Sequence, residues 1–289
     1  MNRRDLLKGF VAAGTAAALH PVCARAAVMD RTDVRANLSA IERKHGGRLG
    51  VAVLDTGNGA HFGWRGDERF LMCSTFKFLL VAAVLARVDR GDERLDRRIV
   101  FDKNALLEYA PVTQQHVGAP GMSIAQLCEA AITLSDNTAA NLLLATTGGP
   151  AGVTHYSRGL GDSFTRLDRI EPELNRANGD DDTTTPNAML ADLRILLLGE
   201  VLSQASRAQL TRWLLANQTG ADCLHAGLPG DWRIGDKTGS GNTANNDIAI
   251  AWPPRRKPLL IAAYYDNAKA EVSTRKAVLA EVGRIVAGA

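Results

Sequence analysis

The sequence holds few cysteines and none of the patterns by which clustered side chains bind a metal. Only four of its 289 residues are cysteine, and no C-x-x-C, H-x-H or H-E-x-x-H pattern occurs. The cysteine spacing fits no zinc motif. We therefore expect neither a metal nor any other cofactor in this protein.

The chain also lacks a strong excess of charge. Its formal net charge is +3, from 34 Lys and Arg against 31 Asp and Glu. Residues 1–26 hold four of the basic residues and one acidic residue, so 30 of each sign remain. A neutral remainder argues against nucleic acid or an anionic membrane surface as the main partner.

Long apolar runs are absent as well. No stretch after the N-terminus approaches the roughly 18 apolar residues of a transmembrane helix. The N-terminus has the order of an export signal, with a twin-arginine pattern at 3–8, a short apolar segment over 9–19 and an A-x-A site at 24–26. We predict a twin-arginine-type signal peptide over 1–26, and a periplasmic or secreted protein without membrane contact after cleavage. A lipid anchor on Cys23 is a weaker alternative, because the preceding valine is bulky where a small residue is wanted.

Strand-like segments occur at both ends of the chain, and helix-like segments fill the middle. The expected strands span residues 48–55, 60–64, 232–241, 247–252 and 259–265. The expected helices span residues 30–45, 74–90, 123–134, 138–148, 189–198 and 273–286. This order predicts an α/β protein of the α+β type, in which an antiparallel sheet built from both termini is flanked by helices and joined to an all-α part.

The same order predicts the domain boundaries. Residues 27–70 and 212–289 would form the α/β subdomain, and residues 71–211 the all-α subdomain. Within the latter, residues 168–186 are polar and show no clear periodicity. A stretch of that length is usually either functional or disordered.

Ser74 and Lys77 begin a long apolar run that predicts a buried helix. Residues i and i+3 lie on one helix face, so we expect the hydroxyl and the amine within hydrogen-bond reach. The helix N-terminus adds partial positive charge and free N–H groups, which favours an activated nucleophile. The S-x-x-K pattern is weak alone: it recurs at 273–276, and an N-capping serine with a solvated lysine is the simpler interpretation of either copy.

Four motifs nevertheless stand in a fixed order: S-x-x-K at 74–77, S-D-N at 135–137, E-P-E-L-N at 171–175 and K-T-G at 237–239. In this order they resemble the signature of the class A serine β-lactamases. The similarity runs from about residue 30 to the C-terminus. Each motif is weak by itself, whereas the ordered set is specific.

The resemblance implies hydrolysis of the β-lactam amide of penicillins and cephalosporins, and therefore antibiotic resistance. It makes Ser74 the nucleophile and Lys77 the residue that keeps it hydrogen-bonded. The backbone N–H groups of Ser74 and Ser240 would form the oxyanion hole. Ser135 would pass a proton to the leaving ring nitrogen.

The resemblance also assigns the substrate contacts. Lys237, Thr238 and Ser240 would hold the substrate carboxylate. Asn137 would bind the amide of the acyl side chain, and Tyr109 would wall a cleft between the two subdomains. The only partner implied is the small-molecule β-lactam, bound by a monomer.

Glu171 distinguishes a hydrolase from an enzyme that stays acylated. The resemblance gives Glu171, with Asn175, a water that attacks the acyl-enzyme, and makes residues 168–186 the active-site loop. Whether Lys77 or Glu171 is the base in acylation stays open. We expect Arg169 and Asp182 to pair across the neck of this loop.

The chain departs from the family in two features of the cleft. The 168–186 loop is two residues shorter than the common form, which puts the placement of Glu171 in question. Many members carry an arginine aligned with Asn246 or with Cys223, and both are absent here. Arg275 or Lys276 would have to replace that positive charge.

We expect no structural disulfide. Cys73, Cys128 and Cys223 remain after signal cleavage, and an odd number leaves at least one thiol free. Val81 and Gly241 occupy the positions that pair with Cys128 and Cys73 in some family members. All three thiols are therefore expected to be unpaired and mostly buried.

Two alternatives use the same serine and lysine chemistry. A peptidoglycan D-alanyl-D-alanine peptidase is disfavoured by the E-P-E-L-N motif at 171–175. A β-lactam sensor that acylates once is disfavoured because no membrane stem or second domain is evident.

Overall fold

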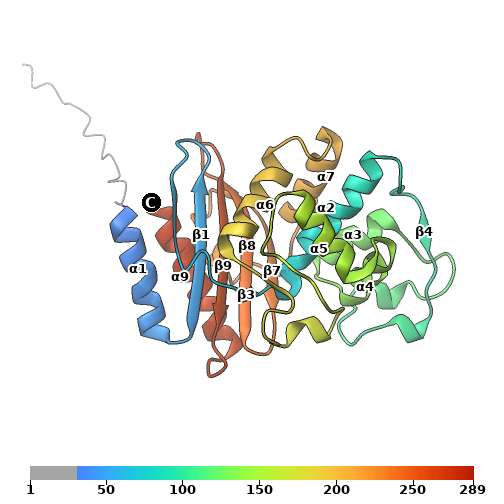
Figure 1. Ribbon diagram of the computed structural model, residues 1–289, viewed down its shortest axis with the longest axis horizontal. Coiled ribbons are helices and arrows are strands. Elements are labelled where there is room, and N and C mark those ends of the chain that lie inside the picture. The colour runs from blue at the N-terminus through green and yellow to red at the C-terminus, as the bar shows by residue number, and fades with distance from the viewer. Residues whose placement is uncertain (1–30) are drawn as a thin grey trace, which may run out of the picture.

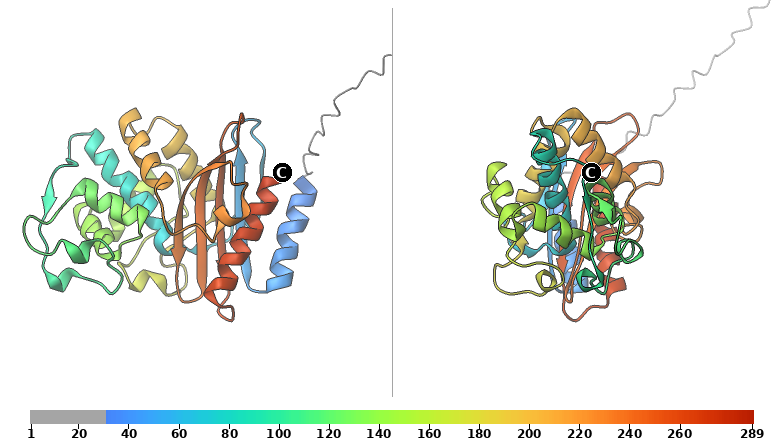
Figure 2. Two further views of the ribbon diagram at one scale, coloured as in Figure 1. Left: turned by 180° about the vertical axis from the view of Figure 1, so that it is seen from behind. Right: turned by 90° about the vertical axis from the view of Figure 1, so that its right-hand side faces the viewer.

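The computed structural model describes residues 31–289, and the predicted signal peptide lies outside the described residues. Figure 1 shows a sheet with two helices, α1 and α9, along one side and most of the other helices gathered on the opposite side. The view from behind in Figure 2 shows the same arrangement. The mixed α/β fold with helices on both sides of the sheet agrees with the prediction.

The sheet has five antiparallel strands drawn from both ends of the chain, in the order β2-β1-β9-β8-β7. The strands are β1 (Arg48–Asp55), β2 (His61–Trp64), β7 (Arg233–Ser240), β8 (Ala244–Trp252) and β9 (Leu259–Asp266). β8 begins earlier than the sequence predicts, because Asn245 and Asn246 pair with β9 instead of forming a turn.

The sheet separates two apolar cores, because successive side chains of a strand point to opposite faces. α1 (Arg31–His45) and α9 (Val272–Ala287) cover one face, where they pack with strand residues such as Val53 and Ile261. The neighbouring residues Ala52 and Leu260 belong to the second core, which they share with the other helices. β7 lies at the edge of the sheet nearest to those helices (Figure 1).

The helical part is built around a central buried helix, α2. Every residue of α2 from Phe76 to Ala86 is buried, as a helix that is apolar on all sides must be. The surrounding helices are α3 (Ile124–Thr133), α4 (Asn137–Thr146), α5 (Gly149–Gly159), α6 (Pro186–Leu198) and α7 (Gln204–Leu215), with α2 itself spanning Phe76–Asp89. The sequence did not distinguish α5 and α7 from the surrounding loops.

Shorter elements connect these helices. Two small antiparallel pairs join β3 (Phe70–Leu71) to β6 (Thr183–Thr184) and β4 (Arg98–Ile99) to β5 (Met122–Ser123). α8 (Leu224–Gly227) is a single turn, and 3-10 turns span Cys73–Thr75, Lys103–Ala105, Thr113–Gln115 and Glu173–Asn175.

Side-chain caps set the helix starts that position the site. Ser123 and Gln126 form a reciprocal capping box at α3. Asp136 caps α4, and its carboxylate also accepts the backbone N–H groups of Val112 and Thr113. Asp136 therefore holds two segments together at the turn that precedes α4.

No helix among residues 31–289 has the length and apolar character to cross a membrane. The subdomain boundaries after residues 70 and 211 stay a prediction. The first boundary falls within β3, which holds residues 70 and 71 and pairs with β6 of the helical part.

Candidate active site

Ser74 lies in the 3-10 turn Cys73–Thr75, which leads directly into α2. The Ser74 side chain does not cap the turn or the helix. The N-cap residues are Met72 and Thr75, and neither makes a side-chain cap bond. A Cβ added to Gly239 of β7 would come within 3.2 Å of the Ser74 nitrogen and 2.7 Å of the Met72 oxygen. Glycine at 239 therefore allows the strand to lie directly against the turn.

The hydroxyl of Ser74 and the amine of Lys77 meet at one carboxylate oxygen. Ser74 Oγ donates to Oε1 of Glu171 over 3.2 Å, and Lys77 Nζ lies 3.0 Å from the same atom. The sequence predicted that serine and lysine face the same way, but it placed the hydrogen bond directly between them. Glu171 comes from a loop far along the chain and provides the contact instead.

Lys77 is fully buried and surrounded by acceptors. Its Nζ donates to the carbonyl and hydroxyl oxygens of Ser135, at 2.7 and 3.3 Å, and to Oδ1 of Asn137 at 2.6 Å. Burial lowers the pKa of Lys77, while the charge of Glu171 opposes that shift. Ser135 sits at φ +57°, a left-handed conformation that few residues other than glycine adopt, and this turn aims both of its oxygens at the amine.

Glu171 is held by asparagines on both its side chain and its backbone. Asn175 Nδ2 donates to Oε2 over 2.5 Å. Asn141 of α4 accepts the Glu171 N–H over 3.0 Å and donates to the Glu171 carbonyl over 2.9 Å. Asn141 stands one helical turn after Asn137, and that i, i+4 spacing is the sequence signal that could have identified it.

Arg169 and Asp182 pair across the two ends of the 168–186 loop, as predicted. Arg169 Nε lies 2.6 Å from Oδ2 of Asp182, and Asp182 Oδ1 accepts the backbone N–H groups of Asp168 and Arg169. The Asp182 carbonyl accepts the N–H of Met72, close to the nucleophile turn. The shortened loop therefore still brings Glu171 to Ser74.

Lys237 of β7 approaches from the opposite side of Ser135. Its Nζ donates to Ser135 Oγ over 3.0 Å and to the Thr238 carbonyl over 2.8 Å. The pKa of Lys237 is lowered to about 7, mainly by burial and to a smaller extent by the charge of Lys77. The hydroxyl of Ser135 thus lies between two buried amines.

These groups open into one cleft of about 300 Å³. It is lined by Ser74, Tyr109, Ser135, Asn137, Asn175, Thr219, Thr238 and Ser240. Seven of these were predicted from the sequence, and the other three predicted residues, Lys77, Glu171 and Lys237, are buried against them. Tyr109 is 49% exposed, which places it at the rim.

Thr219 is the cleft residue that the sequence did not reveal. Its Oγ1 lies 2.5 Å from Oγ1 of Thr238, and it also donates to Oδ1 of Asn217. Asn217 in turn donates to the buried carboxylate of Asp236, next to Lys237. Thr219 therefore orients a hydroxyl on the strand that carries Lys237.

Asn246 and Cys223 occupy the two positions at which the sequence comparison led us to look for an arginine, and both have structural roles here. Asn246 Nδ2 donates to the carbonyls of Leu71 and Met72, at 2.8 and 3.0 Å. Cys223 is buried at the start of α8. Neither position can supply a positive charge to the cleft.

The two candidate replacements differ in their contacts. Arg275 is buried, and its Nε donates to Oδ1 of Asn245 over 2.7 Å, while Asn245 Nδ2 donates to Ser240 Oγ over 3.1 Å. Arg275 therefore orients Ser240 through Asn245. Lys276 pairs with Asp222 at 2.9 Å, and its side chain is 29% exposed.

Cys73, Cys128 and Cys223 are free and buried, as the sequence predicts. Burial raises the pKa of all three thiols, so they stay protonated. A Cβ at Gly241 would lie 2.8 Å from the Cys73 sulfur. The alignment that places these two positions side by side is therefore supported by the structure.

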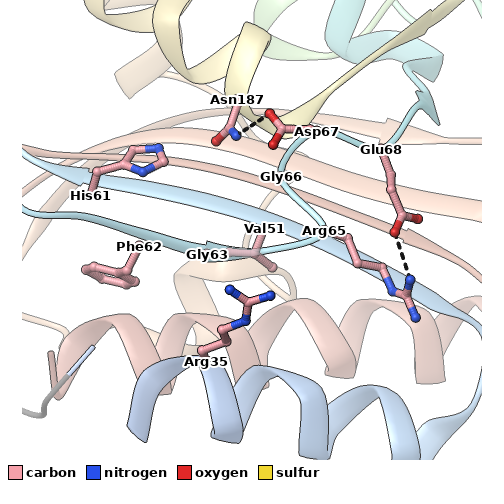
Figure 3. A pocket seen from close by; sticks show the side chains of 10 residues that line it. All are labelled: Arg35, Val51, His61, Phe62, Gly63, Arg65, Gly66, Asp67, Glu68 and Asn187. Atoms are coloured by element: carbon pink, nitrogen blue, oxygen red, sulfur yellow. Dashed lines mark hydrogen bonds and ion pairs between the residues drawn. The ribbon is translucent and has the colours of Figure 1, made fainter. Parts of the chain in front are cut away.

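A larger hollow, of about 480 Å³, lies away from this cleft at the edge strand β2 (Figure 3). None of the predicted site residues lines it. Within it, Arg65 pairs with Glu68, and Asn187 donates to Asp67. The predicted site residues gather at the smaller cleft instead.

Comparisons with known proteins agree with this site. A family model described as "Beta-lactamase enzyme family" matches residues 33–289. β-Lactamase L2 of Stenotrophomonas maltophilia is 49% identical over 278 residues, which cover 95% of this chain and 89% of that protein. β-Lactamase CTX-M-8 of Citrobacter amalonaticus is 46% identical over 88% of each chain.

Solved structures give the same result. A structure titled "Ancestral (GNCA) Beta-lactamase class A" has a TM-score of 0.86 and 59% identity, covering 88% of this chain and 98% of that one. The putative class A β-lactamase PenP of Rhodopseudomonas palustris has a TM-score of 0.86 and 54% identity, covering 89% and 99%. The chain belongs to the β-lactamase enzyme family and is a class A enzyme that hydrolyses β-lactams through a serine.

Proposed function

We propose that Ser74 is the nucleophile that forms the acyl-enzyme and that Glu171 drives its hydrolysis. The observation that carries this assignment is the shared contact of Ser74 Oγ and Lys77 Nζ with Oε1 of Glu171. A serine needs a neighbouring base to become nucleophilic, and this hydroxyl already donates its proton toward a carboxylate.

In acylation, the Ser74 oxygen forms a bond to the β-lactam carbonyl carbon, and the ring carbon–nitrogen bond breaks. Glu171 accepts the serine proton, with Lys77 bonded to the same oxygen. Lys77 Nζ is 3.3 Å from Ser135 Oγ, so Lys77 gives a proton through Ser135 to the leaving nitrogen. Glu171 then passes the serine proton to Lys77 over their 3.0 Å contact and is again a carboxylate. Lys77 stays the alternative first acceptor.

The negative charge that develops on the carbonyl oxygen requires donors. We assign this role to the backbone N–H groups of Ser74 and Ser240. Support comes from the close approach of β7 to the serine turn at Gly239. One such donor is typically worth about 10²–10³ in rate.

In deacylation, Glu171 removes a proton from a water as the water oxygen bonds to the ester carbon. The ester bond to Ser74 then breaks, and the proton returns to the serine oxygen. Asn175 orients the carboxylate through its bond to Oε2, and Asn141 fixes the backbone of Glu171.

Substrate binding involves the remaining residues of the cleft. Lys237, Thr238 and Ser240 bind the carboxylate that penicillins and cephalosporins carry, and Thr219 orients Thr238. Asn137 binds the acyl side-chain amide, and Tyr109 forms the outer wall. These roles rest on the position of each side chain around one cleft.

Class A β-lactamases are exported enzymes, so this chain acts outside the cytoplasm. We infer the twin-arginine route from the motif at 3–8, and a periplasmic or secreted monomer with no nucleic acid or membrane partner. A reporter protein fused to residues 1–26 tests the route, since Arg3→Lys with Arg4→Lys should block its export.

A chromogenic cephalosporin tests the proposed function against the two alternatives. A hydrolase gives sustained turnover, whereas a sensor or a slow peptidase gives one burst equal to the enzyme concentration. Ser74→Ala should abolish turnover while the far-ultraviolet spectrum and the urea midpoint stay unchanged. Multiple turnover by that variant would refute the assignment of the nucleophile.

A further inference from the structure

Two buried carboxyl groups flank the 168–186 loop outside the catalytic cleft. Asp162 follows α5 and is 7% exposed, and Asp192 belongs to α6 and is 1% exposed. One residue therefore precedes the loop and the other follows it.

The two carboxyl groups lack donors for most of their oxygens. Asp162 Oδ1 accepts the N–H groups of Phe164 and Thr165, at 2.7 and 3.0 Å. Asp162 Oδ2 and both oxygens of Asp192 are buried without a hydrogen-bond partner. A buried carboxylate without a donor is costly, so such groups bind a proton or find a partner.

Asp162 is the acidic group that acts on Asp192. The Asp162 carboxyl lies within hydrogen-bond reach of Asp192, and burial together with this neighbour raises the pKa of Asp192 well above its ordinary value. A carboxylic acid has one O–H donor, so one proton between the groups satisfies an oxygen on each.

The other polar groups around Asp192 do not replace this proton. Arg158 of α5 is a cation, but its Nη1 donates to the carbonyls of Asp162 and Thr165. Tyr156 of α5 is partly buried and Tyr264 of β9 is fully buried, and burial raises the pKa of both phenols. Both phenols therefore stay neutral beside the pair.

The segment that carries Asp162 is joined to the end of the loop. Thr165 Oγ1 lies 2.6 Å from Thr184 Oγ1, and the N–H of Arg166 donates to the Thr183 carbonyl over 2.9 Å. α6 and Asp192 follow directly after these threonines. The carboxyl pair thus connects the two chain segments between which Glu171 is held.

We propose that Asp162 and Asp192 share one proton and that this carboxyl pair fixes the base of the active-site loop, which makes Asp192 a positioning residue for Glu171. The pair touches neither substrate nor reacting atoms. It acts by keeping the two ends of the loop at a fixed separation, and it stops doing so when Asp192 loses its proton.

The stability of the folded protein tests the shared proton without any substrate. Asp192 retains its proton above pH values at which the unfolded chain loses it, so the folded state binds more protons and its stability falls as pH rises. The unfolding equilibrium constant of the wild type should rise with pH up to about tenfold per unit more steeply than that of Asp192→Asn. Asp231→Asn, at an exposed position, should keep the wild-type slope.

The rate of deacylation tests the positioning role. The wild-type deacylation rate should fall as pH rises and Asp192 ionises. Asp192→Asn keeps a donor to Asp162 without titrating, so its rate should show no such fall. Asp192→Leu removes the bond and should slow deacylation about tenfold, roughly the effect of one lost hydrogen bond, at all pH values. Asp231→Asn should deacylate like the wild type.

The positioning role rests on the proposed function, whereas the stability slope does not. Equal pH slopes for the wild type and Asp192→Asn would overturn the shared proton and favour a bridging water. A wild-type deacylation rate and pH profile in both Asp192 variants would overturn the positioning role. Absence of any β-lactam turnover in the wild type would instead refute the proposed function and leave the slope as measured.

Discussion

The Nζ of Lys237 lies 3.0 Å from the Oγ of Ser135, and this bond joins the edge strand β7 to the turn before α4. Because Lys77 of α2 contacts the same hydroxyl over 3.3 Å, Ser135 connects β7 to the helix that follows Ser74. In the mechanism that we propose, the charge of these two amines governs both substrate binding and proton transfer.

Binding of the substrate carboxylate should weaken above neutral pH. Burial and Lys77 lower the pKa of Lys237 to about 7, so the free enzyme loses this positive charge as pH rises beyond that value. KM should increase up to about tenfold per pH unit in that range. Lys237→Arg keeps its charge and should show a flatter profile. A wild-type KM that stays constant between about pH 6 and pH 9 would contradict this prediction.

Asn141→Ala should slow deacylation more than acylation. The substitution removes two backbone hydrogen bonds to Glu171, each worth about 0.5–1.5 kcal/mol, so we expect roughly a tenfold loss in the deacylation step. Single-turnover kinetics with a penicillin separates the two steps. Asn58→Ala, in an exposed turn, is the matched control and should behave like the wild type. An equal slowing of both steps would argue against a role confined to Glu171.

Asp136→Ala should destabilise the fold. Asp136 is fully buried and accepts bonds from Val112, Thr113 and Ala139, which would be left without an acceptor. We expect a loss of about 3–5 kcal/mol in the free energy of unfolding. Urea denaturation measures it, and a loss below about 1 kcal/mol would show that water replaces the carboxylate.

Lys276→Ala should raise KM with little change in kcat if Lys276 replaces the missing arginine. The lysine is partly exposed and forms an ion pair with Asp222, whereas the buried Arg275 donates a hydrogen bond to Asn245. We expect a severalfold rise in KM, on the order of 1 kcal/mol, for an exposed charge. Lys269→Ala, at an exposed position, is the control. No change in KM would leave Lys237 as the main carboxylate contact.

The sequence predicts the architecture well, because strands and helices are grouped at different parts of the chain. It misses the start of β8, since Asn245 and Asn246 look like turn residues. Their amides are buried because they bond to Ser240 and to the backbone near the nucleophile, which is a tertiary effect.

The motifs predict residues that the structure brings together at one cleft, but they do not predict how these residues contact one another. Spacing places Ser74 and Lys77 on one face, whereas Glu171, 97 residues from Ser74, decides where the hydroxyl donates. Thr219 has no motif around it and is defined only by its contact with Thr238. The carboxyl pair of Asp162 and Asp192 likewise depends on how α5 and α6 pack.

The central claim is that Ser74 carries the acyl group and that Glu171 assists hydrolysis of this acyl-enzyme. Glu171→Ala should lose general-base assistance worth about 10²–10⁴ in rate and accumulate the acyl-enzyme. Mass spectrometry of this variant after brief exposure to a penicillin tests the claim most directly. We expect one adduct with the mass of the intact substrate, on the peptide that contains Ser74. Unmodified protein with undiminished turnover, or an adduct on another residue, would contradict the account.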